Sequence, residues 1–255
     1  GKFFPALPYG AELSLLIGNI FGRIIEFNFR QNLTLVKKET LAAGIISFWF
    51  TPDQPVNFQA GQFLEYTLAH PWPDGRGERR YFTVASAPTE PLLLLTTRFS
   101  EPGSSFKRAL RALSVGEKII ASKLGGDFTL PADSERKLVF IAGGIGITPF
   151  RCMIKWLLDT GRKRDIVLLY GARSEADLVF KEVFTAAEQH FGLKIAYAWS
   201  EQKVDAAFIT KQVPDLTDRI FYVSGPERMV KNLERVLARL GISRKHIKHD
   251  YFPGY

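Results

Sequence analysis

Short runs of apolar and β-branched residues alternate with turn-forming residues over residues 32–130. Runs of this length between turn formers are typical of β-strands. The predicted strands are residues 33–38, 45–50, 61–68, 79–86, 92–99 and 117–122. Strands at this spacing predict a small antiparallel β-barrel. A predicted helix over residues 104–113 interrupts them, and Ser104 and Ser105 stand at its start as candidate caps.

From residue 136 onward, the pattern changes to apolar strands that alternate with amphipathic helices. The predicted strands are residues 137–142, 165–172, 194–200 and 219–225, and the predicted helices are residues 149–160, 180–191 and 227–240. This alternation predicts an open parallel sheet with helices on its faces. Ligands of such sheets bind beyond the carboxyl ends of the strands. Here those ends are residues 143–146, 171–174, 199–201 and 224–227.

The first strand of this second half runs into a glycine-rich turn that contains Gly144 and Gly146. Thr148 is expected to cap the following helix and Pro149 to begin it. Glycines let the backbone approach a phosphate, and the N-terminus of a helix attracts negative charge. The stretch therefore predicts a dinucleotide site, with an ordinary tight turn as the alternative.

Composition agrees with two globular units. A chain of 255 residues with 46% hydrophobic residues can form two cores of about 100–150 residues each. The formal net charge of +8 suits anionic cofactors, acidic partners or an anionic membrane surface. Because the basic residues are dispersed and no recognised binding motif accompanies them, no nucleic acid partner is expected.

Cysteine and histidine usage limits the chemistry further. Cys152 is the only cysteine, which excludes an internal disulfide and an iron–sulfur cluster held by four thiolates of this chain. Its position on a predicted helix favours a small buried role. The four histidines show no metal-ligand spacing, so no metal site is expected.

The predicted barrel carries two candidate anion sites. Arg79 and Arg80 precede aromatic residues in a strand, where a cation can bind phosphate and a ring can cover a planar group. Gly103 and Ser104 at a helix start offer a second phosphate site. Each feature alone is more often surface charge or helix capping.

Together these residues resemble a known family. Arg80-Tyr81-Phe82-Thr83, followed by Val84-Ala85-Ser86, is similar to the flavin motif of the ferredoxin–NADP reductase superfamily. Other matching motifs follow in that family's order: Gly61-Gln62-Phe63, Gly103-Ser104-Ser105, Gly144-Ile145-Gly146-Ile147-Thr148-Pro149 and Ser224-Gly225-Pro226-Glu227-Arg228-Met229. The resemblance runs from about residue 32 to the C-terminus.

The resemblance implies FAD on a barrel of residues 32–131 and NADH or NADPH on an α/β domain of residues 132–255. It implies that Arg80 pairs with the FAD pyrophosphate, Phe82 packs against the flavin and Thr83 binds near N5. Ser104 and Ser105 would bind the diphosphate. The other implied cofactor-binding residues are Tyr81, Val84, Ser86, Gly103, Gly144, Gly146, Thr148, Pro149, Gly225, Pro226 and Tyr255.

The sequence departs from the family pattern at three places. Phe82 stands where Tyr is common, and Ser224 stands where many members have Cys beside the nicotinamide. The ending resembles an acidic tail with an aromatic residue that covers the flavin, so Phe252 or Tyr255 would shield the ring and Asp250 would assist proton balance. The implied catalytic residues are Thr83, Ser224, Asp250 and Phe252.

Arg173 and Ser174 follow a predicted strand and suit a 2′-phosphate, which favours NADPH over NADH. Glu175 and Asp177 lie close by in the sequence and weaken this preference.

Residues 11–25 are strongly apolar but shorter than the roughly 20 residues that span a bilayer. They are expected to form either a helix packed on the protein or the end of a membrane domain. Because the sequence starts at Gly1 and not at Met, it is interpreted as a piece of a longer chain. Residues 8–21 resemble the last segment of membrane subunits of Rnf and sodium-pumping quinone reductase complexes. That resemblance implies a cytoplasmic reductase at the inner face of a membrane, with residues 1–31 as a separate segment.

The sequence as a whole predicts a reductase that takes hydride from NAD(P)H onto FAD and passes electrons to an acceptor such as a ferredoxin, a flavin or a quinone centre. The alternatives are a stand-alone flavin or ferric reductase and a redox-sensing module without catalysis.

Overall fold

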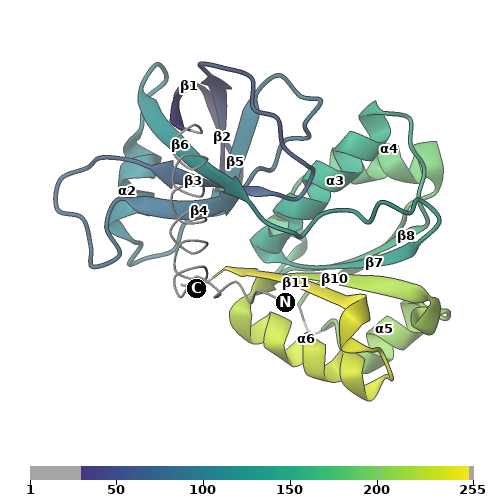
Figure 1. Ribbon diagram of the computed structural model, residues 1–255. Coiled ribbons are helices and arrows are strands. Elements are labelled where there is room, and N and C mark those ends of the chain that lie inside the picture. The colour runs from purple at the N-terminus through teal and green to yellow at the C-terminus, as the bar shows by residue number, and fades with distance from the viewer. Residues whose placement is uncertain (1–29, 201, 253–255) are drawn as a thin grey trace, which may run out of the picture.

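The computed structural model describes residues 30–200 and 202–252, which form two sheets with their helices (Figure 1). The first sheet contains β1 (Arg30–Ala42), β2 (Ile45–Pro52), β3 (Phe63–Thr67), β4 (Arg79–Thr83), β5 (Leu93–Arg98) and β6 (Lys118–Gly125). All paired strands in it are antiparallel, in the order β4-β3-β6-β1-β2-β5. The sheet curls into an open barrel with β4 and β5 at its edges, which confirms the predicted strands.

Alternation along the strands builds the barrel core. Residues two apart in β1 and in β2 fill this core, as with Leu33 and Leu35 or Phe48 and Phe50, all of which are completely buried. Helix α2 (Ser105–Ala112) packs Phe106 and Leu110 against the same core. Ser104 caps this helix, as predicted: its side chain accepts a 3.2 Å hydrogen bond from the backbone N–H of Lys107.

The second sheet is parallel and has the order β11-β10-β7-β8-β9. Its strands are β7 (Lys137–Gly143), β8 (Ile166–Gly171), β9 (Lys194–Ala198), β10 (Arg219–Pro226) and β11 (Ile247–Phe252). Its helices are α3 (Thr148–Asp159), α4 (Lys181–Phe191), α5 (Ala206–Gln212) and α6 (Glu227–Arg239). Four short 3₁₀ segments are also present in the described residues: η1 (Gly144–Ile147), η2 (Glu175–Asp177), η3 (Leu216–Asp218) and η4 (Arg244–His246).

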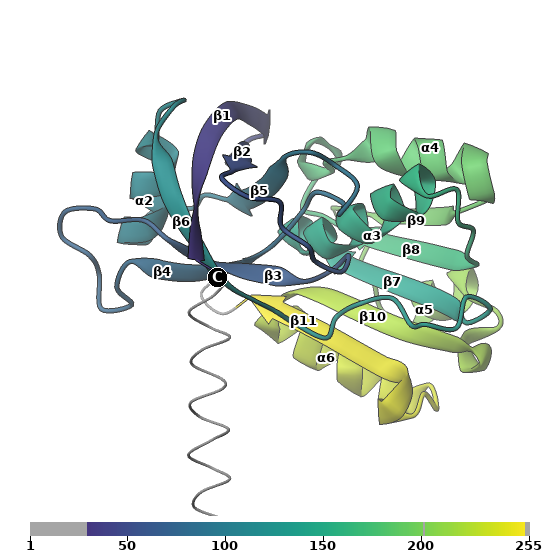
Figure 2. The same ribbon diagram turned by 45° about the horizontal axis from the view of Figure 1, so that its top comes forward.

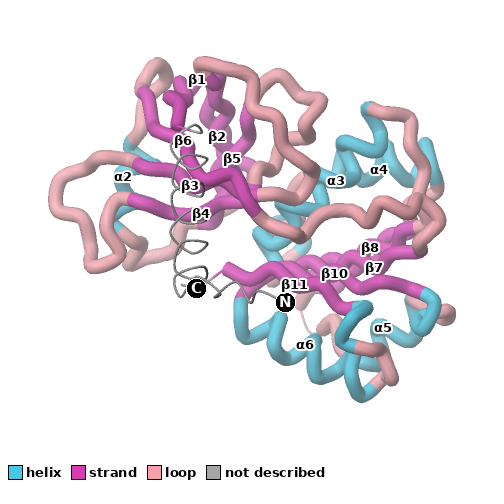
Figure 3. The backbone as a smooth tube through the Cα atoms, viewed as in Figure 1, coloured by secondary structure: helices cyan, strands magenta, loops and turns pink. Residues whose placement is uncertain are grey.

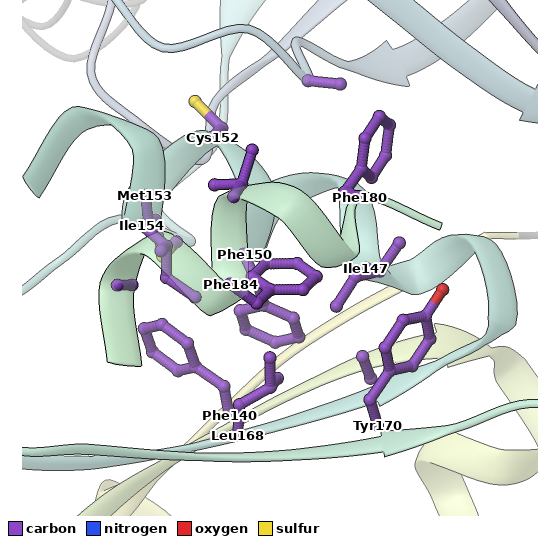
Figure 4. Close-up of a cluster of buried hydrophobic side chains, with 14 of the residues drawn as sticks. Phe140, Ile147, Phe150, Cys152, Met153, Ile154, Leu168, Tyr170, Phe180 and Phe184 are labelled. Carbon is purple, nitrogen blue, oxygen red and sulfur yellow. The ribbon is translucent and has the colours of Figure 1, made fainter. Parts of the chain in front are cut away.

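The helices cover both faces of the parallel sheet (Figures 1 and 3). Phe140 and Tyr222 face α3 and α4, whereas Val139 and Phe221 face α5 and α6. Figure 4 shows the first of these cores, where the rings of Phe140 and Phe150 stack with centroids 4.6 Å apart. The parallel α/β fold predicted from the sequence is therefore confirmed.

Four elements differ from the expectations. Thr148 does not cap α3: it is the first residue of that helix, and its hydroxyl donates to the carbonyl of Ile145 instead (3.2 Å). A 3₁₀ turn, η1, separates the glycines from the helix. Helix α5 and strand β11 were not predicted, because seven residues make a weak helical pattern and Ile247–Phe252 has three polar residues in a row instead of the alternation typical of a strand.

The two halves share a core. Ala85 and Phe128 from the barrel half pack in the same buried cluster as Phe150 and Met153 of α3. Cys152 is buried, as predicted, and its thiol donates to the carbonyl of Ser86 (2.9 Å). Strand β11 lies at the sheet edge, and its C-terminal end is directed towards the barrel (Figures 1 and 2).

The apolar segment of residues 11–25 and its expected membrane domain lie outside the described residues. Within residues 30–200 and 202–252, no helix combines the length and the apolar character that crossing a membrane requires.

Candidate functional site

A cavity of about 500 Å³, here called the barrel cavity, opens at the edge strand β4. Seven of the residues predicted to bind a cofactor line it: Arg80, Tyr81, Phe82, Thr83, Gly103, Ser104 and Thr148. They come from β4, from the start of α2 and from the first residue of α3. The volume lies within the range of ordinary small-molecule sites, roughly 300–1,000 Å³.

Arg80 is held by the loop that precedes its strand. One terminal nitrogen, Nη1, donates to the carbonyls of Arg76 and Gly77, both at 2.9 Å, and the other, Nη2, donates to the Asp74 carboxylate at 2.9 Å. Its Nε is buried and has no hydrogen-bond partner among the described residues. A guanidinium has five N–H donors, so this N–H remains for a bound group.

Asp74 connects this loop to the start of α2. Its carboxylate accepts from the backbone N–H of Ser105 (2.9 Å), and its own backbone N–H donates to the Ser105 hydroxyl (2.8 Å). The N–H of Ser105 and the Arg80 guanidinium hold the pKa of Asp74 well below its usual range. The Ser105 side chain also lies 3.0 Å from Nε2 of His70, so it is engaged within the protein and does not line the barrel cavity.

Phe82 forms the apolar wall of the barrel cavity. Its ring packs against Tyr66 and Phe106, with both centroid distances at 5.9 Å. Tyr81, which also lines the cavity, is 51% exposed and donates to Glu65 (2.6 Å). Thr83, at the end of the strand, is 4% exposed.

A second cavity of about 390 Å³, here called the sheet cavity, lies at the carboxyl ends of the parallel strands. Gly144, Arg173 and Pro226 of the predicted site line it. Arg98 reaches it from the barrel strand β5 and forms an ion pair with Asp177 (3.2 Å). The region beyond the carboxyl ends of the strands, where a ligand was expected to bind, therefore contains a cavity.

The glycines at the end of β7 and in η1 also allow close packing. A Cβ on Gly146 would lie 2.3 Å from the carbonyl oxygen of Ser224, and a Cβ on Gly143 would lie 2.2 Å from Sδ of Met229. Gly144 differs, because its φ is +53° and nothing lies within 4 Å of its Cβ position. Gly146 thus lets β10 approach η1, Gly143 leaves room for the side chain of Met229, and Gly144 provides the turn.

Ser224 and Asp250 are opposite each other on β10 and β11. Ser224 is completely buried, and its hydroxyl has no partner among the described residues. Burial raises the pKa of Asp250 to about 6. These two predicted residues are brought together by the strand register, which local sequence does not reveal.

Several predicted residues line neither cavity. In the described part of the chain these are Val84, Ser86, Ser105, Gly146, Pro149, Ser174, Ser224, Gly225 and Asp250. Val84 is a core residue, the Ser86 hydroxyl accepts from the N–H of Leu94 (3.0 Å), and Ser174 is exposed. Phe252 is the last residue of β11, and Tyr255 lies outside the described residues.

Sequence reasoning missed much of the lining. Arg76, Thr96, Thr97, Ser100 and Lys107 line the barrel cavity, and Lys203 and Asn232 line the sheet cavity. Lys107 carried a usable signal, because a lysine in the first turn of a helix opposes the helix dipole. In residues 30–200 and 202–252, no group of three or more His, Cys, Asp or Glu side chains is placed to hold a metal ion.

The two cavities meet at η1, because Ile145 lines both of them. The barrel cavity and the sheet cavity are therefore neighbours on either side of Ile145. The arrangement suits transfer between two bound groups.

Comparison with known proteins gives consistent matches. The family described as "Oxidoreductase NAD-binding domain" matches residues 140–235. The chain is 27% identical over 245 residues to a glycine betaine monooxygenase reductase subunit of Chromohalobacter salexigens, covering 88% of this chain and 65% of the relative. It is 29% identical over 243 residues to a stachydrine N-demethylase reductase subunit of Rhizobium meliloti, covering 88% and 68%. The chain thus spans about two thirds of the length of these curated relatives.

Solved structures share the fold. The cytochrome P450 reductase GcoB of Amycolatopsis superposes with a TM-score of 0.75 at 22% identity, covering 88% of this chain and 69% of the other. A ferredoxin-NADP+ reductase from Plasmodium falciparum superposes with a TM-score of 0.73 at 16% identity, covering 88% and 96%.

Proposed function

We infer that this chain, which belongs to the ferredoxin–NADP reductase-like family of FAD- and NAD(P)-binding oxidoreductases, oxidises NAD(P)H and delivers the electrons to a partner. The observation that carries this proposal is the pair of cavities that meet at Ile145. One cavity would hold the flavin and the other the nicotinamide nucleotide.

The barrel cavity has the properties that FAD requires. Arg76, Arg79, Arg80 and Lys107 supply positive charge for a diphosphate, and Phe82 supplies an apolar wall for a planar ring. The buried, unpartnered Nε of Arg80 in the described structure is a donor for which a phosphate oxygen is a suitable acceptor. FAD, once bound, supplies the redox chemistry, because it accepts a hydride and releases electrons singly or in pairs.

The protein residues would then bind and orient. We assign Arg80 and Ser104 to the diphosphate, and Phe82 and Thr83 to the flavin ring. Asp250, whose pKa burial raises to about 6, would take up or release a proton beside Ser224, which it faces across the β10–β11 pair. The corresponding division of the chain is a FAD-binding barrel of residues 32–131 and a nucleotide-binding domain of residues 132–255.

The sheet cavity favours NADPH. Arg98, Arg173 and Lys203 line it, and no acidic residue does so within the described part of the chain. A 2′-phosphate would gain from these cations, whereas a free ribose is usually bound by a carboxylate. Asp177 neutralises only Arg98, to which it is paired.

The partner is proposed to be an oxidising protein centre. The relatives named above are reductase subunits of a monooxygenase and of an N-demethylase, and the chain covers about two thirds of their length. An oxygenase, a ferredoxin or a haem protein is therefore the proposed class of acceptor, in the cytoplasm, where NAD(P)H is available.

Purification tests the proposal directly. The protein should carry or take up FAD with a flavin absorption spectrum, and anaerobic NADPH or NADH should bleach that spectrum within one turnover. A protein that takes up no FAD, or a bound flavin that neither nucleotide reduces, would exclude the function.

A further inference from the structure

Helix α6 carries a row of positive charge along its outer side, on the face of the parallel sheet opposite α3 and α4 (Figure 1). The exposed basic residues of the helix, here called the α6 basic row, are Arg228, Lys231, Arg235 and Arg239. At about 100° per residue, these four side chains lie within roughly 80° of the helix circumference. Leu233 and Leu237, which are buried against the sheet, lie on the opposite side of the helix. The row therefore points away from the core.

The acidic residues of α6 do not balance this row. They are Glu227 and Glu234, and both lie at one flank of the row on the helix surface. Glu227 forms an ion pair with Lys231 (2.6 Å), and Glu234 contacts His249 of β11 (2.7 Å). The outer side of the helix thus keeps an excess of positive charge.

The positive charge continues beyond the helix. Arg244 and Lys245 are exposed in the segment that leads from α6 to β11. Residues 227–250 contain seven Lys and Arg against three Asp and Glu, which amounts to half of the formal net charge of +8. A short segment on one side of the sheet therefore carries half of the net charge of the chain.

The stability of the helix does not require this arrangement. Lys231 and Arg235 are four residues apart, as are Arg235 and Arg239, and like charges at this spacing repel each other. Arg228 stands in the first turn, where a cation opposes the helix dipole. An extended anionic surface along the row would remove both penalties.

We propose that the α6 basic row binds the anionic headgroups of a phospholipid bilayer, with the helix axis parallel to the membrane surface. Basic residues near an anionic bilayer contribute to binding through charge alone, and a row on one side of a helix presents all its cations to a flat surface. A protein interface is instead centred on aromatic or apolar side chains. Helix α6, which the structure describes in full, exposes no large hydrophobic side chain.

The sequence contains a second feature that suits a membrane. Residues 11–25 are strongly apolar. A single apolar anchor gives weak and reversible membrane binding, whereas an apolar anchor combined with a polybasic patch gives stable binding. The α6 basic row would supply the polybasic patch.

The proposed membrane contact is separate from the cofactor sites. The sheet cavity lies at the carboxyl ends of the parallel strands, beside the start of α6, where Met229 lines it. Arg235 and Arg239 are in the second half of the helix and line neither cavity. The inference therefore goes beyond the proposed function and does not rest on it.

The test measures co-sedimentation of the 255-residue chain with phospholipid vesicles. Phosphatidylcholine vesicles with about 30% phosphatidylglycerol present an anionic surface, and pure phosphatidylcholine vesicles are the neutral reference. The variant Arg235→Glu/Arg239→Glu reverses two charges of the row. The control Lys163→Glu/Lys194→Glu makes the same change in net charge at two exposed positions, before β8 and at the start of the edge strand β9.

The wild-type chain should bind anionic vesicles more tightly than neutral ones, and about 0.5 M salt should remove the difference. Arg235→Glu/Arg239→Glu should weaken binding to anionic vesicles about 30-fold or more, whereas the control should stay within about threefold of wild type. Circular dichroism checks that both variants are folded.

Equal binding of the wild-type chain to anionic and neutral vesicles would overturn the proposal, as would equal losses in the two double variants. Retention of the wild-type chain on immobilised polyglutamate, without binding to anionic vesicles, would also overturn it and would assign the row to an acidic protein partner. Each of these results would leave the reductase function intact, because FAD uptake and flavin reduction are measured separately.

Discussion

Arg151 of α3 binds both carboxylate oxygens of Glu90, a residue of the loop that follows β4. The same guanidinium donates to the carbonyl of Ala85 (3.1 Å), and its side chain is only 9% exposed. The helix that follows the glycine turn is thereby tied to the segment that follows the proposed flavin strand. This contact joins the α/β half of the molecule to the barrel half.

We therefore expect Arg151→Met to destabilise the protein. Removing one partner of a largely buried ion pair leaves Glu90 uncompensated, which costs about 3 kcal/mol of unfolding free energy. Lys181→Met is a suitable control, because its ion pair with Glu175 is solvent-exposed and should contribute less than about 1 kcal/mol. Urea denaturation of both variants measures the difference, and similar losses would show that Arg151 has no special structural role.

The same substitution should slow reduction of the flavin. Arg151 lines neither cavity, so FAD content should be retained while the distance between the bound groups becomes less well defined. A misplacement of about 1 Å can reduce a rate about 100-fold. Anaerobic stopped-flow mixing with NADPH measures this rate, and an unchanged rate in FAD-loaded Arg151→Met would contradict the positioning role.

Arg80→Ala should reduce FAD retention in the purified protein. The variant loses the Nε donor and also the contacts that hold Arg76 and Gly77 around the cavity. The ratio of flavin to protein absorbance gives the result, with Arg162→Ala, outside both cavities, as a charge-matched control. Flavin content equal to wild type would remove Arg80 from the cofactor site.

Arg173→Ala should discriminate between the two nucleotides. If Arg173 binds a 2′-phosphate, the KM for NADPH rises about 10-fold or more and the KM for NADH stays nearly constant. Steady-state kinetics with both donors measures the split, and Lys211→Ala, on the exposed side of α5, serves as the control. Equal changes for NADPH and NADH would show that Arg173 does not read the phosphate.

The sequence predicted the two sheets well because their strands are short apolar runs between turn formers, as at residues 45–50, or continuous buried runs, as at residues 138–142. The site was predictable only where it coincides with short motifs, such as residues 80–83. Lys107, Arg98 and Lys203 reach the cavities through tertiary folding, and β11 places Asp250 beside Ser224 through register with β10. Such pairings depend on residues far apart in the chain, which local patterns do not encode.

Asp250 gives the protein a pH-dependent stability. Its pKa is raised from 3.8 to about 6 because burial disfavours the charged form. Below pH 3.8 the Asp250 carboxyl group is mostly protonated in the folded and the unfolded protein, so its burial does not lower the free energy of unfolding. Between pH 4 and 6 the carboxyl group ionises in the unfolded protein first, so the free energy of unfolding falls as pH rises. A shift of about two pKa units corresponds to about 3 kcal/mol above pH 6. Asp250→Asn, which stays neutral, should therefore be more stable than wild type at pH 7.5 by up to this amount and nearly equal at pH 4. Urea denaturation at the two pH values measures the gain, and a gain of the same size at both would show that charge burial is not its cause.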